Sequence, residues 1–147
     1  PSYLYNGMAV DGGNGKIYHL GGSTDVVSQS SVFEYDPVGN TWTSKRHMIF
    51  SNADACAVLV ENEIYCFGGI TTYIQIYDIS QNQWKLGTLQ IPNRRGFAAC
   101  AIGSKIYLFG GTTGADALNT TYELDIRAFE PIEIEGLDVL LSWLAIK

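Results

Sequence analysis

The residues of this chain that could hold a metal ion or act as nucleophiles are two histidines and three cysteines. His19 falls in a predicted strand and His47 in a loop, and neither has a second ligand at the short spacing of zinc or copper sites. Cys56, Cys66 and Cys100 are odd in number and widely spaced, which argues against a disulfide framework. We expect no metal site, no cofactor, and cysteines that are reduced and buried.

A nucleotide loop and a hydrolytic triad are also disfavoured. Residues 12–16 read Gly-Gly-Asn-Gly-Lys, which superficially resembles a phosphate-binding loop. Ile17 follows in place of Ser or Thr, however, and a strand follows in place of a helix. The Ser, His and Asp residues are scattered without a local arrangement that singles out a triad. We therefore expect no catalytic residues in the chain.

Composition and charge restrict the class of partner. The 147 residues are 46% hydrophobic and 16% charged, which favours a folded domain over disorder. A net charge of −6, with basic groups of only two or three residues, disfavours nucleic acid and anionic membranes. The apolar segment 137–146 is about half of the roughly 20 residues that a membrane-spanning helix needs. We expect neither nucleic acid nor a membrane as partner.

Three copies of one short pattern, Ile-Tyr-x-x-Gly-Gly, divide the chain into repeats. The glycine pairs are Gly21 and Gly22, Gly68 and Gly69, and Gly110 and Gly111. The tyrosines are Tyr18, Tyr65 and Tyr107. The pairs recur after 47 and then 42 residues. Regular spacing of this kind predicts repeated structural units.

Two further landmarks flank these stretches. Small residues precede them at 7–10, 55–58 and 99–102. A Tyr-Asp stretch follows the first two copies at 32–36 and 74–78, and six residues later come Trp42 and Trp84. Turn-forming residues separate the segments. Four short strands in a period of 42 to 47 residues are typical of one blade of a β-propeller.

This pattern resembles the kelch repeat, whose marks are a Gly-Gly pair that ends the second strand, a Tyr within it, and a Tyr and a Trp downstream. The resemblance implies an all-β fold, a kelch-type β-propeller of about three four-stranded blades. Because closed propellers have about four to eight blades, we expect a partial propeller or a fragment of a roughly six-bladed one, completed by other blades of the same protein or by a second copy. The expected segments are a repeat region 1–136, with blades at about 5–45, 54–87 and 97–136, and a tail 137–147 of unknown role.

The third copy departs from the pattern. Leu124 stands in place of the downstream tyrosine. Pro131 stands six residues after Asp125, where the other copies carry tryptophan. The sequence therefore leaves the outer strand of the third blade unspecified.

The repeated residue types predict how blades pack. We expect the second-strand tyrosines to share one face of equivalent strands, with hydroxyls that reach backbone partners, and both tryptophans to be buried between blades. Trp42→Ala would then cost about 3–5 kcal/mol, and Thr43→Ala far less. Each glycine pair ends a strand, where a positive φ or a close backbone neighbour excludes a Cβ.

The resemblance also implies a surface for partners. In kelch proteins the loops that join one blade to the next, and those after the glycine pairs, often bind a protein. Here those loops are 45–52, 88–95, 23–31, 70–73 and 112–119. The candidate partner-binding residues are Arg94, Arg95, Phe50, Asn52, Tyr73 and Arg46. The alternative for the two adjacent arginines is that they tether a loop by donating to carbonyl oxygens.

We expect a cytoplasmic protein-interaction module, an adaptor or scaffold, because the cysteines are predicted to be free. One alternative is a propeller enzyme that acts on a sugar, or a copper-dependent oxidase. Another is a secreted, carbohydrate-binding propeller, which the glycosylation sequon at Asn119 would permit.

Overall fold

The computed structural model describes residues 4–128 and 131–132 and shows an all-β protein, as the repeats predict. The first sheet, blade 1, contains β1 (Met8–Asp11), β2 (Ile17–Leu20), β3 (Val32–Asp36) and β4 (Thr41–Lys45). Blade 2 contains β5 (Ala55–Val60), β6 (Glu63–Gly68), β7 (Tyr73–Asp78) and β8 (Gln83–Gln90), and blade 3 contains β9 (Ala98–Ile102), β10 (Lys105–Phe109) and β11 (Thr121–Asp125). A 3-10 helix, η1 (Ile126–Ala128), and a short strand, β12 (Pro131–Ile132), follow.

Each blade is an antiparallel meander in which neighbouring strands are consecutive in the chain. The last turns of blades 1 and 2 have matching chemistry. Asp36 accepts hydrogen bonds from the backbone of the turn 37–40, and Asp78 does the same in the turn 79–82. Each turn ends on an asparagine in the left-handed region, Asn40 at φ 49° and Asn82 at φ 52°. Asparagine adopts this conformation more readily than other side chains do, which explains its recurrence.

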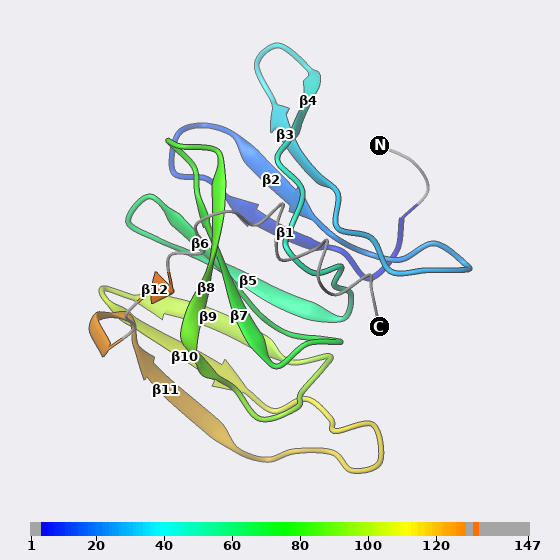
Figure 1. Ribbon diagram of the computed structural model, residues 1–147, viewed down its shortest axis with the longest axis vertical. Coiled ribbons are helices and arrows are strands. Elements are labelled where there is room, and N and C mark those ends of the chain that lie inside the picture. The colour runs from blue at the N-terminus through cyan, green and yellow to red at the C-terminus, as the bar shows by residue number, and fades with distance from the viewer. Residues whose placement is uncertain (1–3, 129–130, 133–147) are drawn as a thin grey trace.

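The blades follow one another, with the innermost strands β1, β5 and β9 in contact in that order (Figure 1). Two apolar clusters fill the spaces between the sheets. Blade 2 contributes Ile64, Cys66 and Tyr77 to the cluster that it shares with blade 1. Its alternate residues, such as Tyr65 and Phe67, enter the cluster shared with blade 3. A two-residue strand period thus gives blade 2 two buried faces.

The glycine pairs occupy positions where neighbouring segments nearly touch. A Cβ on Gly21, at φ 61°, would lie 2.3 Å from the carbonyl oxygen of Asn52. A Cβ on Gly68, at φ 68°, would lie 2.5 Å from the carbonyl oxygen of Arg94. In both blades the glycine meets the backbone that connects its blade to the following one. Both expected reasons for glycine therefore apply at these positions.

Three details of packing differ from expectation. The hydroxyls of Tyr18 and Tyr65 donate to carboxylates, where backbone partners were expected: Tyr18 donates to Glu34 at 2.6 Å, and Tyr65 donates to Glu63 at 2.9 Å. Trp42 is 46% exposed, so its predicted burial between blades is wrong for the described residues. It lies on the face of blade 1 that points away from blade 2, where no other described blade covers it.

The third detail is the free cysteine on β9. Cys100 is exposed, whereas Cys66 is buried and Cys56 is half-buried. The reason is the face on which it lies: Ala99 and Ala101 pack toward blade 2, so Cys100, which lies opposite Tyr107, points to the other side of blade 3, and no described blade covers that side. Ile102 lies opposite Lys105. The small-residue stretch of the third copy is therefore two residues closer to its hairpin than that of the second, where Val58 lies opposite the equivalent tyrosine.

The strand β12 does not extend blade 3. It pairs with β8, so Pro131 lies opposite Gly87 in blade 2. Blade 3 has three strands among the described residues, with β11 at its edge. Within the same part of the chain, no helix has the length and apolar character needed to cross a bilayer.

Candidate partner-binding surface

A hollow of about 410 Å³ opens where the segment from blade 1 to blade 2 meets the loop between β6 and β7. Its lining consists of Ile49, Phe50, Ser51, Ile70, Thr71 and Tyr73. Both segments fall within loops for which the resemblance to kelch proteins implies partner binding. The structure thus brings together two of the predicted residues, Phe50 and Tyr73.

The two aromatic rings stack with their centroids 5.7 Å apart and an interplanar angle of 29°. Phe50 is 36% exposed and Tyr73 is 42% exposed, and Ile70 beside them is also exposed. Offset aromatic pairs of this kind are stabilised by their geometry in addition to the area that they bury. The result is an apolar surface that faces solvent.

The backbone of Phe50 is held by a buried amide side chain from β7. Gln75 accepts a hydrogen bond from the Phe50 N–H at 2.8 Å and donates one to its carbonyl at 3.2 Å. The ladder between β7 and β8 shifts register between Tyr73 and Gln75, and both side chains contact Phe50. The sequence analysis missed Gln75, although a polar residue between two isoleucines inside a strand was a usable signal.

Asn52 lies beneath the hollow and not on its surface. Its side chain is buried, donates to the carbonyl of Gly68 at 2.9 Å, and accepts from the backbone N–H groups of Ala53 and Ile70. Since this amide is satisfied internally, Asn52 positions the two loops relative to each other. It does not present a group to a partner.

The two adjacent arginines have different environments. Arg94 is 1% exposed, and its guanidinium donates to the hydroxyl and, at 3.4 Å, to the carbonyl of Thr120. It also lies 4.6 Å from the ring centroid of Tyr122. These contacts match the alternative in which the arginine tethers a loop. Arg95 is exposed, and its backbone pairs with Thr112 in the loop after the third glycine pair.

Arg46 is exposed, but its backbone makes the defined contacts. Its N–H donates to the side-chain oxygen of Asn82 at 2.9 Å. Its carbonyl accepts from the indole N–H of Trp84 at 2.9 Å. The residue therefore attaches the end of blade 1 to the outer strand of blade 2. This role was not evident from the sequence.

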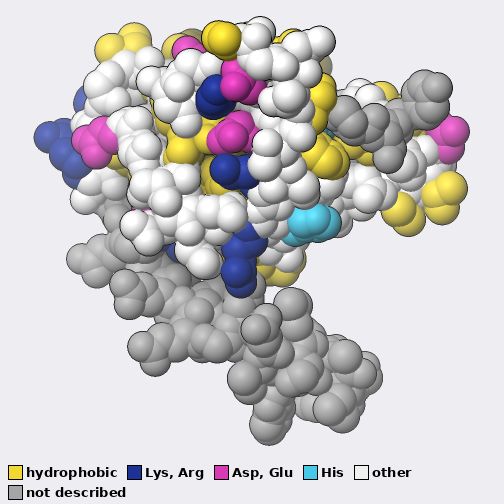
Figure 2. Space-filling model, turned by 90° about the horizontal axis from the view of Figure 1, so that it is seen from above, with side chains coloured by type: hydrophobic (Ala, Val, Ile, Leu, Met, Phe, Trp, Pro, Cys, Tyr) yellow, Lys and Arg dark blue, Asp and Glu magenta, His cyan; other side chains and the backbone are white. Residues whose placement is uncertain are grey.

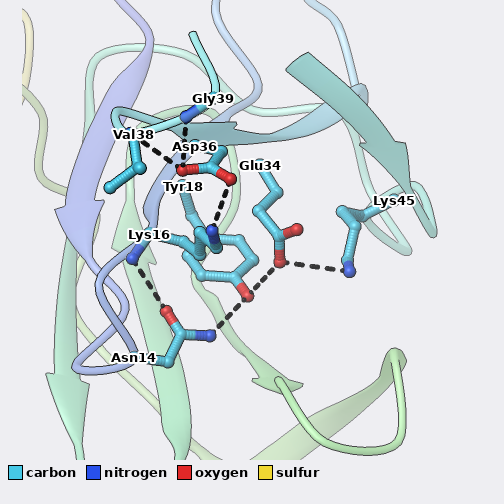
Figure 3. A network of polar contacts seen from close by, with 8 residues as sticks. All are labelled: Asn14, Lys16, Tyr18, Glu34, Asp36, Val38, Gly39 and Lys45. Carbon is cyan, nitrogen blue, oxygen red and sulfur yellow. Dashed lines mark hydrogen bonds and ion pairs between the residues drawn. The ribbon is translucent and has the colours of Figure 1, made fainter. Parts of the chain in front are cut away.

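A polar network stabilises the blade 1 side of the molecule (Figure 3). Glu34 accepts from Tyr18 and lies 3.2 Å from the amine of Lys45, while Lys16 pairs with Asp36 at 2.7 Å. Burial, and then the bond to Glu34, raise the pKa of Tyr18 to about 12. Burial alone would raise the pKa of Glu34, but the bonds from Tyr18 and Lys45 outweigh it and lower that pKa.

Charges of both signs lie side by side on the face of the molecule seen in Figure 2. The described ion pairs follow the same pattern, as with Lys85 and Glu63 in blade 2. A surface of interspersed charges lacks the single-sign field that attracts a polyanion over long distances. Recognition on such a surface depends on local shape and on apolar anchors.

The groups with catalytic potential are separated. Burial lowers the pKa of His19 and raises the pKa values of the Cys56 and Cys66 thiols, which keeps these groups uncharged near neutral pH. Among the residues that the structure describes, no three His, Cys, Asp or Glu side chains gather as a metal site would require. Asn119, the sequon residue, is exposed in the loop before β11.

Comparison with known proteins gives consistent matches. A sequence profile described as the KLHDC2/KLHL20/DRC7 Kelch-repeats domain matches residues 7–137. Kelch-like protein 25 of Xenopus tropicalis is 28% identical over 116 residues, which are 75% of this chain and 20% of that protein. The putative F-box/kelch-repeat protein At1g27420 of Arabidopsis thaliana is 32% identical over 123 residues, which are 71% of this chain and 34% of that protein.

A viral protein shows a similar match. The kelch repeat protein M-T8 of myxoma virus is 30% identical over 96 residues, which are 60% of this chain and 17% of the viral protein. The chain therefore spans between 17% and 34% of the length of these three relatives.

Proposed function

Because the chain belongs to the kelch-repeat family, we propose that it is a protein-interaction module whose partner docks in the hollow beside Phe50 and Tyr73. The observation that carries this proposal is the exposed, stacked aromatic pair on a backbone that the buried Gln75 holds in place. Aromatic residues are enriched among the few residues that dominate binding energy at protein interfaces. A preorganised pair also loses little conformational entropy when a partner binds.

The shape of the site supports a protein partner. The hollow is shallow and lined mainly by apolar side chains from two loops, which suits a protruding side chain of another protein. The connection 88–95 is the repeat equivalent of 45–52, so Arg95 extends the same loop-bearing side of the molecule. Exposed arginine is a second residue type enriched at protein interfaces.

A role as an adaptor or scaffold in the cytoplasm follows from this proposal. The three cysteines of the chain are free, which suits a reducing compartment. The negative net charge and interspersed surface charges favour a protein over nucleic acid or an anionic membrane as partner. Binding without catalysis is the activity that we assign.

The test compares proteins captured by the wild-type chain with those captured by a Phe50→Ala, Tyr73→Ala double variant. Quantitative mass spectrometry should show at least a tenfold loss of specifically bound proteins, because truncation of two anchor residues costs more than about 1.4 kcal/mol. Val38→Ala is the control, since Val38 is an exposed apolar residue in the turn 37–40. Thermal unfolding of all three proteins checks that the fold is kept. Equal capture by the double variant and the control would disprove the assignment.

The arginines provide a second comparison. Arg95→Ala should reduce capture modestly at unchanged thermal stability, since its side chain is exposed. Arg94→Ala should lower stability, because Thr120 and Tyr122 lose a buried partner. Reduced capture by Arg94→Ala without any loss of stability would instead place Arg94 in the interface.

A further inference from the structure

Arg94 is a buried cation without a carboxylate partner. Its side chain is 1% exposed, yet among the residues that the structure describes no acidic group forms an ion pair with it. Its Nη2 donates to the hydroxyl of Thr120 at 2.7 Å, and its Nη1 donates to the carbonyl of the same residue at 3.4 Å. Burying a charge is costly unless the charge is paired. The position therefore favours an anion beside Thr120.

Thr120 combines a fixed hydroxyl with access to solvent. It is exposed and ends the irregular segment 118–120 that leads into β11. Its carbonyl accepts the N–H of Gly110 at 3.1 Å, which holds the residue beside the third glycine pair. Surface segments without regular structure are the parts of a protein that other proteins reach most readily. The hydroxyl is thus held next to Arg94 in a segment that a modifying enzyme can approach.

A second cation lies along the same loop. Arg95 is exposed, and its backbone pairs with Thr112. A Cβ on Gly114 would lie 2.5 Å from the Nη2 atom of Arg95, so this guanidinium packs against the loop 112–119. Two adjacent arginines from the connection between blades 2 and 3 therefore contact the chain that runs from the third glycine pair to β11.

The acidic side chains of this region do not neutralise the two arginines. Tyr122 packs in the cluster between blades 2 and 3, so Glu123, the next residue of β11, points to the opposite face of the sheet. There Glu123 pairs with Lys105 at 2.6 Å. Asp116 is the one acidic residue of the loop 112–119, and it is exposed. A dianion beside Arg94 would thus meet more positive than negative charge.

We propose that Thr120 is a phosphorylation site and that Arg94 binds its phosphate. A protein kinase would transfer the γ-phosphoryl group of ATP: the O–H bond of Thr120 breaks, an O–P bond forms, the proton passes to a base of the kinase, and ADP leaves. The new oxygens then lie beside a guanidinium that is already bonded to the same hydroxyl oxygen. Hydrogen bonds between arginine and phosphate are stronger than those to a neutral hydroxyl.

A phosphate on Thr120 fits this position better than an anion from solution. Because Arg94 is 1% exposed, a free carboxylate or phosphate reaches it only if Thr120 moves away. A phosphate attached to Thr120 needs only a rotation of that side chain. The modification would fasten the start of β11 to the connection 88–95, and so strengthen the contact between blades 2 and 3. It does not depend on the hollow beside Phe50.

The first test measures the ionisation of the phosphate by 31P NMR. Phosphothreonine is incorporated at position 120 through a reassigned stop codon, and the chemical shift is followed between about pH 4 and pH 8, on both sides of the ordinary second pKa of about 6. Arg94 should lower this pKa by about one unit. The reference is a phosphorylated peptide of residues 116–124, which has the same local sequence and no fold.

Two matched variants separate the arginines. Arg94→Gln keeps a side-chain donor for Thr120 but removes the charge, and it should return the phosphate pKa to the value in the peptide. Arg95→Gln removes the neighbouring, exposed charge and should keep most of the shift. Since the loss of a buried arginine can unfold a protein, the wild-type phosphoprotein in concentrated urea is a second reference, and its pKa should equal that of the peptide.

The same shift predicts the effect on stability. A phosphate pKa that is lower in the folded state gives stability that is complete above the unfolded value of about 6 and is lost as pH falls through the folded value. One unit corresponds to about a tenfold decrease in the unfolding equilibrium constant. Urea unfolding of the phosphorylated and unmodified proteins above and below this range should show that change.

The second test asks whether a kinase modifies this residue. The unmodified chain is incubated with ATP and a eukaryotic cell extract and is then digested with trypsin. The peptide of residues 106–127 should gain one phosphoryl group, and fragment ions should place it on Thr120. Thr120→Val has a side chain of nearly the same shape without the hydroxyl, and it should remove the modification.

Three outcomes would overturn the proposal. The first is a phosphate pKa in the folded protein equal to that of the peptide. The second is a lowered pKa that Arg95→Gln abolishes and Arg94→Gln does not, since Arg95 would then bind the phosphate. The third is a 106–127 peptide without phosphate, or with phosphate only on another of its threonines.

Discussion

Blade 2 and blade 3 both carry phenylalanine directly before the Gly-Gly pair, but the side chain is buried in one blade and exposed in the other. Phe67, next to the last residue of β6, is fully buried, whereas Phe109, the last residue of β10, is 43% exposed. The two strands share the Ile-Tyr-x-x-Gly-Gly pattern, so local sequence does not cause the difference. Its cause is the neighbouring sheet, because blade 3 covers Phe67 and no described blade covers Phe109.

The comparison shows that the sequence of one blade is suited to packing between two neighbouring blades. Each repeat encodes two apolar faces, and among the described residues both faces are covered only in blade 2. Stability in such an array is approximately the sum of the intrinsic stabilities of the repeats and the interfaces between neighbours. Equivalent substitutions in different blades should therefore have different costs, and pairs of them measure the contribution of the interface.

The largest contrast is expected between Phe67→Ala and Phe109→Ala. The first should lower the free energy of unfolding by about 3–5 kcal/mol, since it leaves a cavity among buried side chains. The second should cost less than about 1 kcal/mol, because its side chain is partly in water. Urea unfolding with unchanged m-values measures both. Equal costs would mean that the blade 2–blade 3 interface does not bury Phe67 in solution.

A smaller contrast is expected between Asn82→Gly and Asn40→Gly. Glycine tolerates the positive φ of both turns, so each change mainly removes a hydrogen-bonding side chain. Asn82→Gly should cost about 1 kcal/mol, since it releases Arg46 and Tyr77. Asn40→Gly should cost a few tenths of a kcal/mol, because only the exposed bond from Tyr35 is lost. Thermal and urea unfolding measure the difference, and a larger effect at Asn40 would contradict it.

The smallest expected effect is on the pH dependence of the free energy of unfolding. Here the comparison is between Tyr18, on a covered face, and Tyr107, on an uncovered one. The pKa of Tyr18 rises from 10.0 to about 12, so the folded state keeps a proton that the unfolded state loses between these values. Ionisation of Tyr18 therefore does not change the free energy of unfolding well below pH 10. As pH rises toward 12 it lowers that free energy, by less than about 1 kcal/mol at pH 11.

Tyr18→Phe should reduce this alkaline loss when the free energy of unfolding is measured between pH 9 and 11, about the range where free tyrosine ionises. Tyr107→Phe should reduce it less, since that side chain is partly exposed. A greater effect of Tyr107→Phe would show that burial between blades is not the main cause of the raised pKa.

Much of the fold was predictable from the sequence because the repeat signals are local. The Gly-Gly pairs, the Tyr-Asp stretches and the turn residues fixed the strands of blades 1 and 2 at nearly their observed positions. The exposure of Trp42 was not predictable in this way, since it depends on whether another blade is present. The pairing of β12 with β8 is likewise a long-range contact that no local pattern marks.

The candidate site was predictable only in part. Phe50 and Tyr73 fell within loops that the family uses for partners, and the structure places them in contact. The same reasoning selected Asn52 and Arg94, whose side chains are buried. Polar residue type and loop position cannot distinguish a residue that binds a partner from one that holds two loops together, because both require hydrogen-bonding groups at the same turns.

The hollow beside Phe50 has one wall on the segment that leaves blade 1 and the other on a loop of blade 2. A partner bound there would stabilise the contact between blades 1 and 2, because it binds only when the two blades are docked. By linkage, a ligand at 100 times its Kd would stabilise the docked arrangement by about 2.7 kcal/mol. Substitutions in the buried space between blades 1 and 2 should then weaken partner affinity without altering any atom that the partner touches.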